Sequence, residues 1–115
     1  MSDALINGLF EAVDGSDWSA MERLFHARIV YERPGYEPFD GLERVLRFYQ
    51  KERILASGKH HLEHIVCEGS AGACWGRFVG FKKDGSAVDE LFADVYFFED
   101  GQIRKRRSYF FRPAV

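Results

Sequence analysis

The sequence has few of the residues that mark disulfide-stabilised, secreted or membrane-spanning chains. Of its 115 residues, two are cysteines and three are prolines, and no run of apolar residues approaches a membrane span. A transmembrane helix needs about 20 consecutive apolar residues. The first residues also lack a basic segment followed by an apolar run, so no secretion signal is expected. These absences favour a single cytoplasmic domain over residues 1–115 with no membrane partner.

The chain also lacks a surplus of positive charge and the short motifs of several enzyme classes. Its formal net charge is -2, whereas surfaces that bind nucleic acid are strongly basic. The one basic cluster, residues 104–107, is expected to be a solvated strand end. The sequence contains no Gly-rich phosphate loop, nucleophile elbow or Cys-x-x-Cys pair. We therefore expect no nucleic-acid partner and no cofactor.

The cysteines and histidines are spaced unfavourably for a redox or metal site. Cys67 and Cys74 flank a turn-like segment, and buried free thiols are favoured over a cross-strand disulfide in a chain without a secretion signal. His60 and His64 would share one face of a strand, but at a rise of ~3.3 Å per residue they lie about 13 Å apart. That separation is too large for two ligands of one ion. No metal site is expected.

The sequence does contain enough apolar material for one core, since 46% of it is hydrophobic and eleven residues are Phe. In the first half, apolar residues recur every three or four positions, which predicts helices. The first covers residues 5–13, and Asp17 caps a second, shorter one. The third opens at Asp40, with Glu43 as a capping-box partner, and ends near residue 55. A short strand at 29–31 precedes it.

After Gly58 the apolar period changes to two, which is typical of strands. Four strands are predicted, joined by turns at 68–72, Asp84-Gly85 and Asp100-Gly101; they cover residues 60–67, 73–81, 88–98 and 103–111. Helices first and strands last predict an α+β fold, in which three N-terminal helices pack on a curved, mainly antiparallel sheet.

Two charged residues in these strands stand among large apolar neighbours. Asp94 shares one strand face with Phe92 and Tyr96, and an acid in such surroundings is either kept protonated or paired with a cation. Arg77 shares a face of the preceding strand with Trp75 and others. A guanidinium binds carboxylates through a two-pronged fork. Arg77 could therefore hold Asp94 or a ligand oxyanion, or it could extend into solvent at the sheet edge.

Several local motifs span almost the whole chain and lie at residues 13–18, 31–34, 39–49, 94–103 and 108–110. Their order resembles that of the NTF2-like superfamily, in particular its SnoaL-like and ketosteroid-isomerase-like members. The resemblance implies a cone-shaped domain whose pocket holds a small, largely apolar or carbonyl-containing molecule. A homodimer is also expected, because an open sheet rich in Phe and Tyr can bury its outer face against a second copy.

The catalytic residues of characterised relatives are only partly present. The general-base Asp of ketosteroid isomerases looks like Arg33 here, whereas their protonated Asp looks like Asp94. The Tyr and Arg of limonene-epoxide hydrolase look like Tyr31 and Arg77, but neither of its two Asp residues is matched. The resemblance thus implies neither of these two reactions by its usual route.

The sequence predicts a pocket with catalytic and substrate-binding residues but leaves two functions open. The catalytic candidates are Asp94, Arg33, Arg77 and Tyr31; the substrate-binding candidates are Trp75, Val79, Phe92, Tyr96, Ser108 and Phe110. One function is a SnoaL-like isomerase or cyclase, with Asp94 as acid or base and Arg33 or Arg77 stabilising an oxyanion. The other is a non-catalytic module that binds a ligand or dimerises.

Overall fold

Two helices open the chain, and each buries one apolar stripe. The computed structural model describes residues 2–112. Helix α1 (Ser2–Asp14) buries Ile6, Leu9 and Val13 among others. Asp17 caps α2 (Trp18–Leu24), as the sequence predicts, by accepting a hydrogen bond from the backbone N–H of Ala20 at 3.1 Å.

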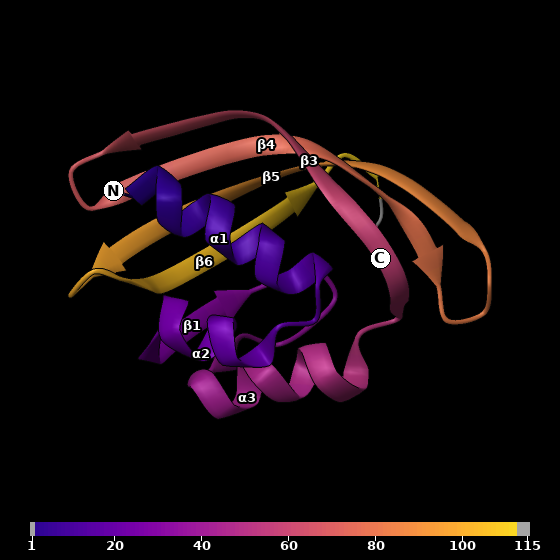
Figure 1. Cartoon of the computed structure of the whole chain (residues 1–115), viewed down its shortest axis with the longest axis horizontal. Coiled ribbons are helices and arrows are strands. Elements are labelled where there is room, and N and C mark those ends of the chain that lie inside the picture. Colours follow the sequence, from indigo (N-terminus) through magenta and orange to yellow (C-terminus); the bar gives the residue numbers. More distant parts are fainter. Residues whose placement is uncertain (1, 113–115) are drawn as a thin grey trace.

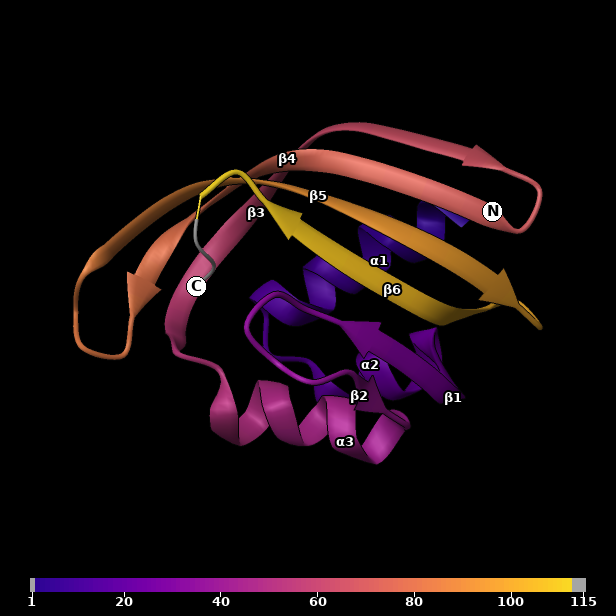
Figure 2. The same cartoon turned by 180° about the vertical axis from the view of Figure 1, so that it is seen from behind.

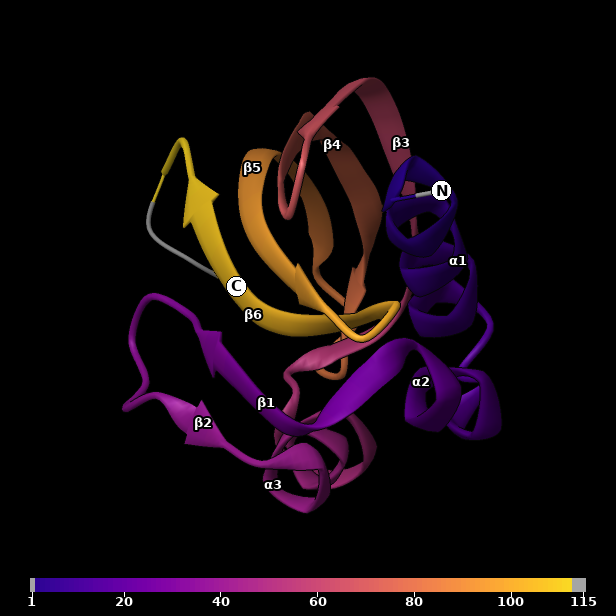
Figure 3. The ribbon, with the colours of Figure 1, turned by 90° about the vertical axis from the view of Figure 1, so that its left-hand side faces the viewer.

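Six strands form one sheet in the order β2-β1-β6-β5-β4-β3, in which β1 and β6 are parallel and the other pairs antiparallel. Their bounds are β1 Phe25–Glu32, β2 Phe39–Asp40, β3 Leu55–Glu68, β4 Ala71–Lys82, β5 Ala87–Glu99 and β6 Gln102–Phe110. The long strands β3 to β6 arch over α1, while β1 and β2 lie beside α3 (Figures 1 and 3). The predicted α+β arrangement of three helices on a curved, mainly antiparallel sheet is confirmed.

The segment between β1 and β3 differs from the prediction. Asp40 belongs to the short strand β2, and Gly41, at φ 96, precedes α3 (Leu42–Arg47) without a side-chain cap. The expected capping box at Asp40 is therefore wrong, because pairing with β1 holds that residue extended. A π-helical turn, η1 (Phe48–Glu52), ends the helical segment early, and β3 begins at Leu55.

The sheet bends where β3 and β4 approach each other closely. A Cβ on Gly76 would lie 2.1 Å from the carbonyl oxygen of His61, so only glycine fits there. A bulge between Leu62 and His64 then shifts the register of β3 by one residue. Because side chains alternate along a strand, that bulge turns His64 to the face opposite the one that carries His60.

The two faces of the long strands have different surroundings. The concave face carries the core and packs on the helices, whereas no helix of the described chain covers the convex face (Figures 1 and 2). We call the convex face of β3 to β6 the outer face. None of the helices within residues 2–112 has the length and apolarity needed to cross a bilayer.

Candidate functional site

The concave face of the sheet encloses a small cavity rich in charged groups, which we call the inner cavity. Its volume is ≈ 20 Å³, room for about one water molecule. The loop after β1, the segment after η1 and strands β3 to β6 supply its walls. The lining residues are Arg33, Arg53, Leu55, His60, Phe78, Glu90, Phe92, Asp94, Arg106, Ser108 and Phe110.

Asp94 is held in this cavity through only one of its two carboxylate oxygens. Its Oδ2 accepts from Nε and Nη2 of Arg106 at 2.9 and 2.8 Å and from the hydroxyl of Tyr96 at 2.9 Å. The residue is 1% exposed, and its Oδ1 has no hydrogen-bond partner among residues 2–112. A buried carboxylate oxygen without a donor is costly. Oδ1 is therefore an acceptor available to a molecule in the cavity.

Arg106 is fixed on every side. Besides its contacts with Asp94, it donates from Nη1 to the hydroxyl of Tyr49 at 2.7 Å, and its guanidinium lies 4.5 Å from the ring centre of Tyr31. Burial by itself lowers the pKa of Arg106, but Asp94 together with the tyrosines around the guanidinium outweighs burial and raises the pKa well above its ordinary value. Arg106 stays charged and positions Asp94.

A second hydrogen-bonded chain joins Arg33, Tyr31 and Ser108. Arg33 Nη1 donates to the hydroxyl of Tyr31 at 3.0 Å, and that hydroxyl lies 2.8 Å from Ser108 Oγ. Burial raises the pKa of Tyr31, but the positive charges of Arg106 and Arg33 outweigh it, so the pKa is lower than usual. Tyr31 is therefore a better proton donor than an ordinary tyrosine.

Arg53 adds a further positive charge to the wall. Its guanidinium lies 5.4 Å from the ring centre of Tyr49 and 5.7 Å from that of Phe78. Its buried Nε has no hydrogen-bond partner in the described chain, and burial lowers its pKa from the usual value. Together with Arg33 and Arg106, this residue makes the inner cavity suited to a ligand that carries or develops negative charge.

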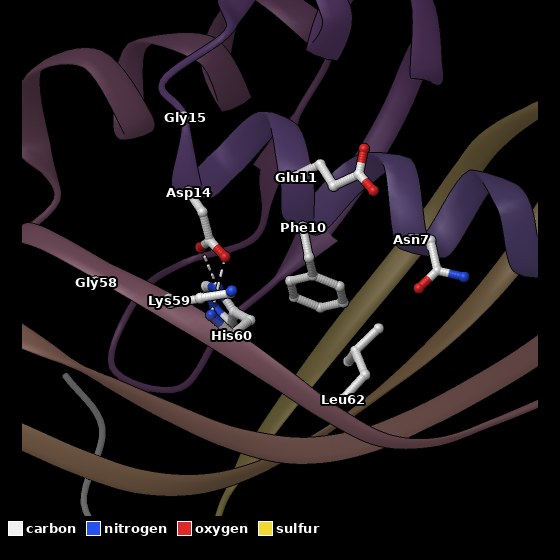
Figure 4. Close-up of a pocket in the computed structure, with 9 residues that line it drawn as sticks. All are labelled: Asn7, Phe10, Glu11, Asp14, Gly15, Gly58, Lys59, His60 and Leu62. Carbon is white, nitrogen blue, oxygen red and sulfur yellow. Dashed lines mark hydrogen bonds and ion pairs between the residues drawn. The ribbon is translucent and has the colours of Figure 1, made fainter.

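His60, at another wall of the cavity, is paired with Asp14. His60 Nδ1 and Asp14 Oδ1 are 2.5 Å apart, and the backbone N–H of His60 donates to Asp14 Oδ2 at 2.9 Å (Figure 4). Since a carboxylate only accepts, Nδ1 carries the proton of the neutral ring. Burial lowers the pKa of His60, and the hydrogen bond to Asp14 only partly offsets that effect. His60 is thus neutral near pH 7, with its Nε2 lone pair available.

The structure brings most of the predicted site residues together. Asp94, Arg33, Phe92, Ser108 and Phe110 line the inner cavity. Tyr31 and Tyr96 are also buried, and each forms a hydrogen bond with a residue that lines the cavity, Ser108 and Asp94 respectively.

Three predicted residues lie elsewhere, on the outer face. Trp75 and Val79 are both 43% exposed there. Arg77 lies between them, and its Nε is 3.4 Å from Asp89 Oδ1. Of the roles left open for Arg77, the pairing with Asp94 is wrong, since Arg106 takes that position and the Arg77 side chain is 53% exposed.

The hairpin loop between β4 and β5 explains this error. A two-residue turn at 84–85 would place Trp75 opposite Asp94, so that Trp75, Arg77 and Val79 would share a face with Asp94 as predicted. The loop instead holds three residues, 83–85, so that Cys74 lies opposite Asp94. A shift of one residue moves every side chain of a strand to the other face.

Sequence reasoning missed Arg106, the cationic partner of Asp94, and the whole histidine–aspartate pair. A bulge between Phe97 and Phe98 shifts β6 by one residue, which turns Arg106 inward together with Ser108. The alternation of these two residues along one strand was a usable signal, because they must share a face. No comparable signal linked Asp14 with His60, since 46 positions separate them.

The residues considered for a metal or redox site do not come together. His64 stacks on Trp75 at the outer face, so it does not share a face with His60. Both cysteines are free thiols, but Cys67 is exposed and only Cys74 is buried, where burial raises its pKa to about 11. The expectation that both thiols are buried is wrong for Cys67.

Comparisons with known proteins agree with this architecture. Residues 6–106 match the model of the SnoaL-like domain family. No protein with a curated description matches the chain. Among solved structures, an NTF2-like protein of unknown function from Burkholderia pseudomallei superposes with TM-score 0.85 at 15% identity, over 93% of this chain and 88% of that one.

Two further structures have similar folds at low identity. A candidate SnoaL-like polyketide cyclase from Jannaschia gives TM-score 0.83 at 16% identity, over 94% of this chain and 83% of that one. An LEH-like epoxide hydrolase from M. tuberculosis gives TM-score 0.81 at 18% identity, over 93% of this chain and 80% of that one. At such identities the likeness shows the NTF2-like fold alone.

Proposed function

Because the chain belongs to the SnoaL-like domain family, we propose that it is a small-molecule enzyme of the isomerase or cyclase type that moves a proton next to a carbonyl group. Oδ1 of Asp94 is the observation that supports this most directly. It is a buried carboxylate oxygen at the wall of a cavity, with no donor among the described residues. A general base needs such an acceptor within reach of the proton that it takes.

The surrounding cations suit the charge that proton abstraction creates. Loss of a proton beside a carbonyl leaves an enolate, whose charge rests mainly on oxygen. Arg33 and Arg53 bring guanidinium groups to the cavity wall, where low solvent exposure strengthens their attraction for that oxygen. Arg106 is bound to Oδ2 of Asp94 and orients Oδ1 without occupying it.

The apolar part of the wall selects the body of the substrate. Leu55, Phe78, Phe92 and Phe110 line the same cavity as the charged groups. A carbonyl compound with an apolar skeleton can therefore contact these rings while its oxygen faces the guanidiniums. Such a molecule is larger than the water-sized space, so its entry requires side chains to move, as they often do on binding.

The test is exchange of protons next to the carbonyl in D₂O, followed by ¹H NMR. A panel of linear and cyclic ketones, including 2-butanone and cyclohexanone, would be incubated with the purified chain and with buffer alone. We expect at least one ketone to exchange faster with the protein. No acceleration across the panel, with no chemical-shift change in the cavity residues on addition of any ketone, would contradict the proposal.

The second candidate is a non-catalytic module that dimerises through its outer face. Eight large apolar side chains are at least 39% exposed there: Val66, Trp75, Val79, Phe81, Leu91, Val95, Phe97 and Tyr109. At roughly 80 Å² each they expose roughly 600 Å², close to the ~800 Å² that each partner buries in a standard interface. A second copy of the chain fits this face, because a two-fold axis pairs one patch with itself.

Light scattering coupled to size-exclusion chromatography tests the dimer. The wild-type chain should elute with twice the mass of one chain, and Val79→Glu with Val95→Glu should elute as a monomer. Lys51→Glu, an exposed change away from the outer face, is the control. A monomeric wild-type chain at micromolar concentration would rule out this interface.

A further inference from the structure

One side chain separates the inner cavity from a second depression on the molecule. An outer groove of ≈ 660 Å³ runs between the end of α1 and the start of β3 (Figure 4), lined by Asn7, Phe10, Glu11, Asp14, Gly15, Gly58, Lys59, His60 and Leu62. His60 also lines the inner cavity and is the one residue of the described chain that both sites share. Its ring is therefore a partition between the groove and the buried charges.

The two nitrogen atoms of this ring have different surroundings. Nδ1 is bound to Asp14, which lines the outer groove but not the inner cavity, and whose side chain is 19% exposed. Nε2 makes no hydrogen bond to residues 2–112, although the ring is at the cavity wall. Nδ1 is thus connected to a partly solvated carboxylate, whereas Nε2 is available to a molecule that reaches the ring.

Three aromatic rings fix the imidazole in this orientation. Its ring centre lies 4.6 Å from that of Phe10, 4.6 Å from that of Phe78 and 5.3 Å from that of Phe92. The side chain is 10% exposed. The ring cannot rotate without displacing these neighbours, so the arrangement that holds Nδ1 toward Asp14 and leaves Nε2 without a partner among residues 2–112 is stable.

The electrostatic surroundings favour transient protonation over a permanent charge. Burial, assisted by the positive charges of Arg53 and Arg106, lowers the pKa of His60, while Asp14 acts in the opposite direction. Glu11 and Lys59 line the groove side. The imidazole is neutral at rest, and the Asp14 carboxylate bound to Nδ1 stabilises the imidazolium that forms when Nε2 takes a proton.

From this geometry we infer that His60 is a second proton-transfer residue of the inner cavity, and that Asp14 positions it and links it to solvent. This inference rests on the proposed function. Asp94 removes a proton at one position of the substrate, and His60 Nε2 exchanges a proton at another. When Nε2 gains a proton, that of Nδ1 passes to Asp14 Oδ1 and on to groove water. In the reverse sequence, groove water returns a proton through Asp14 to Nδ1 as Nε2 gives its proton back to the substrate, so each exchange removes one proton and returns one.

The first test needs no substrate, because it reads the ring directly. In ¹⁵N-detected NMR of the intact chain, His60 should be the neutral Nδ1–H tautomer, with its Nδ1 proton shifted far downfield by the short hydrogen bond to Asp14. Asp14→Asn keeps the volume but offers a weaker acceptor, so that downfield resonance should disappear. An Nε2–H tautomer in the wild-type chain, or an unchanged spectrum in Asp14→Asn, would overturn the inference.

The second test uses exchange of ketone protons in D₂O. His60→Asn places an amide donor near Asp14 but removes Nε2, and it should slow exchange by about 100-fold, the scale of one acid–base group. Asp14→Asn should slow it about 10-fold. His64→Asn is the matched control, because it makes the same change on the same strand at the outer face.

The outcomes separate this inference from the proposed function. If the wild-type chain exchanges ketone protons and Asp94→Asn does not, but His60→Asn keeps the full rate, the relay is wrong and the enzyme proposal stands. If the wild-type chain exchanges none of the ketones, both fail together. Thermal unfolding of each variant confirms that a lost rate does not reflect an unfolded chain.

Discussion

Removal of the guanidinium of Arg106 should cost far more stability than removal of an exposed one. In Arg106→Met, the carboxylate of Asp94 stays 1% exposed and keeps only the Tyr96 hydroxyl as a donor within residues 2–112. Breaking a buried ion pair in this way costs about 3–5 kcal/mol. Urea unfolding followed by tryptophan fluorescence measures the loss as a change in the free energy of unfolding.

The opposite single change should be less harmful. In Asp94→Asn, Arg106 retains the Tyr49 hydroxyl at 2.7 Å and the ring face of Tyr31 at 4.5 Å. We expect a loss of about 2–3 kcal/mol, because hydrogen bonds and aromatic contacts still partly compensate the buried charge. The double variant should lose less than the sum of the single losses, by at least about 1 kcal/mol.

Arg77→Met is the matched control for this cycle. It removes an arginine whose side chain is 53% exposed and whose partner, Asp89, is 62% exposed. An exposed ion pair contributes less than about 1 kcal/mol. If Arg106→Met were no more destabilising than Arg77→Met, or if the Arg106 and Asp94 losses simply added, Arg106 would not be the counter-ion that holds Asp94.

Three further predictions follow from single residues. His60 has a lowered pKa in the folded chain, so below about pH 6.5 the folded state binds fewer protons than the unfolded one and the free energy of unfolding should fall. Urea unfolding at about pH 7.5 and 5.5 should show a smaller fall in His60→Gln than in the wild-type chain. Cys67 is exposed and Cys74 is buried with its pKa raised to about 11, so a thiol reagent should label Cys67 alone in the folded chain and both in urea. Gly76→Ala places a Cβ 2.1 Å from the His61 carbonyl oxygen and should lower the free energy of unfolding by roughly 2–4 kcal/mol. An unchanged midpoint of the urea unfolding transition would contradict this.

The sequence was sufficient for the fold because apolar periodicity reports which way each side chain faces. The change from a period near four to a period of two correctly separated the helices from the four long strands. The short strand Phe39–Asp40 was missed, since two residues carry no period. Only pairing with β1 makes Asp40 part of a strand.

The site was predicted less completely because it depends on register. Asp94 was found from its own strand, but its partner depended on a three-residue hairpin loop and on a bulge at Phe97 and Phe98. Each irregularity shifts a strand by one residue and exchanges its faces. Two such shifts put Arg77 outside and Arg106 inside. The sequence pattern does not show either of these two register shifts.

The most direct test of the central claim compares Asp94→Asn with Asp89→Asn in the ketone exchange assay. Both changes neutralise one carboxylate of β5, but Asp94 is buried at the inner cavity and Asp89 is exposed beside Arg77. We expect Asp89→Asn to exchange ketone protons at the wild-type rate and Asp94→Asn to fall by 100-fold or more, about the effect of a general base. Equal rates in the two folded variants would show that Asp94 does not transfer the proton.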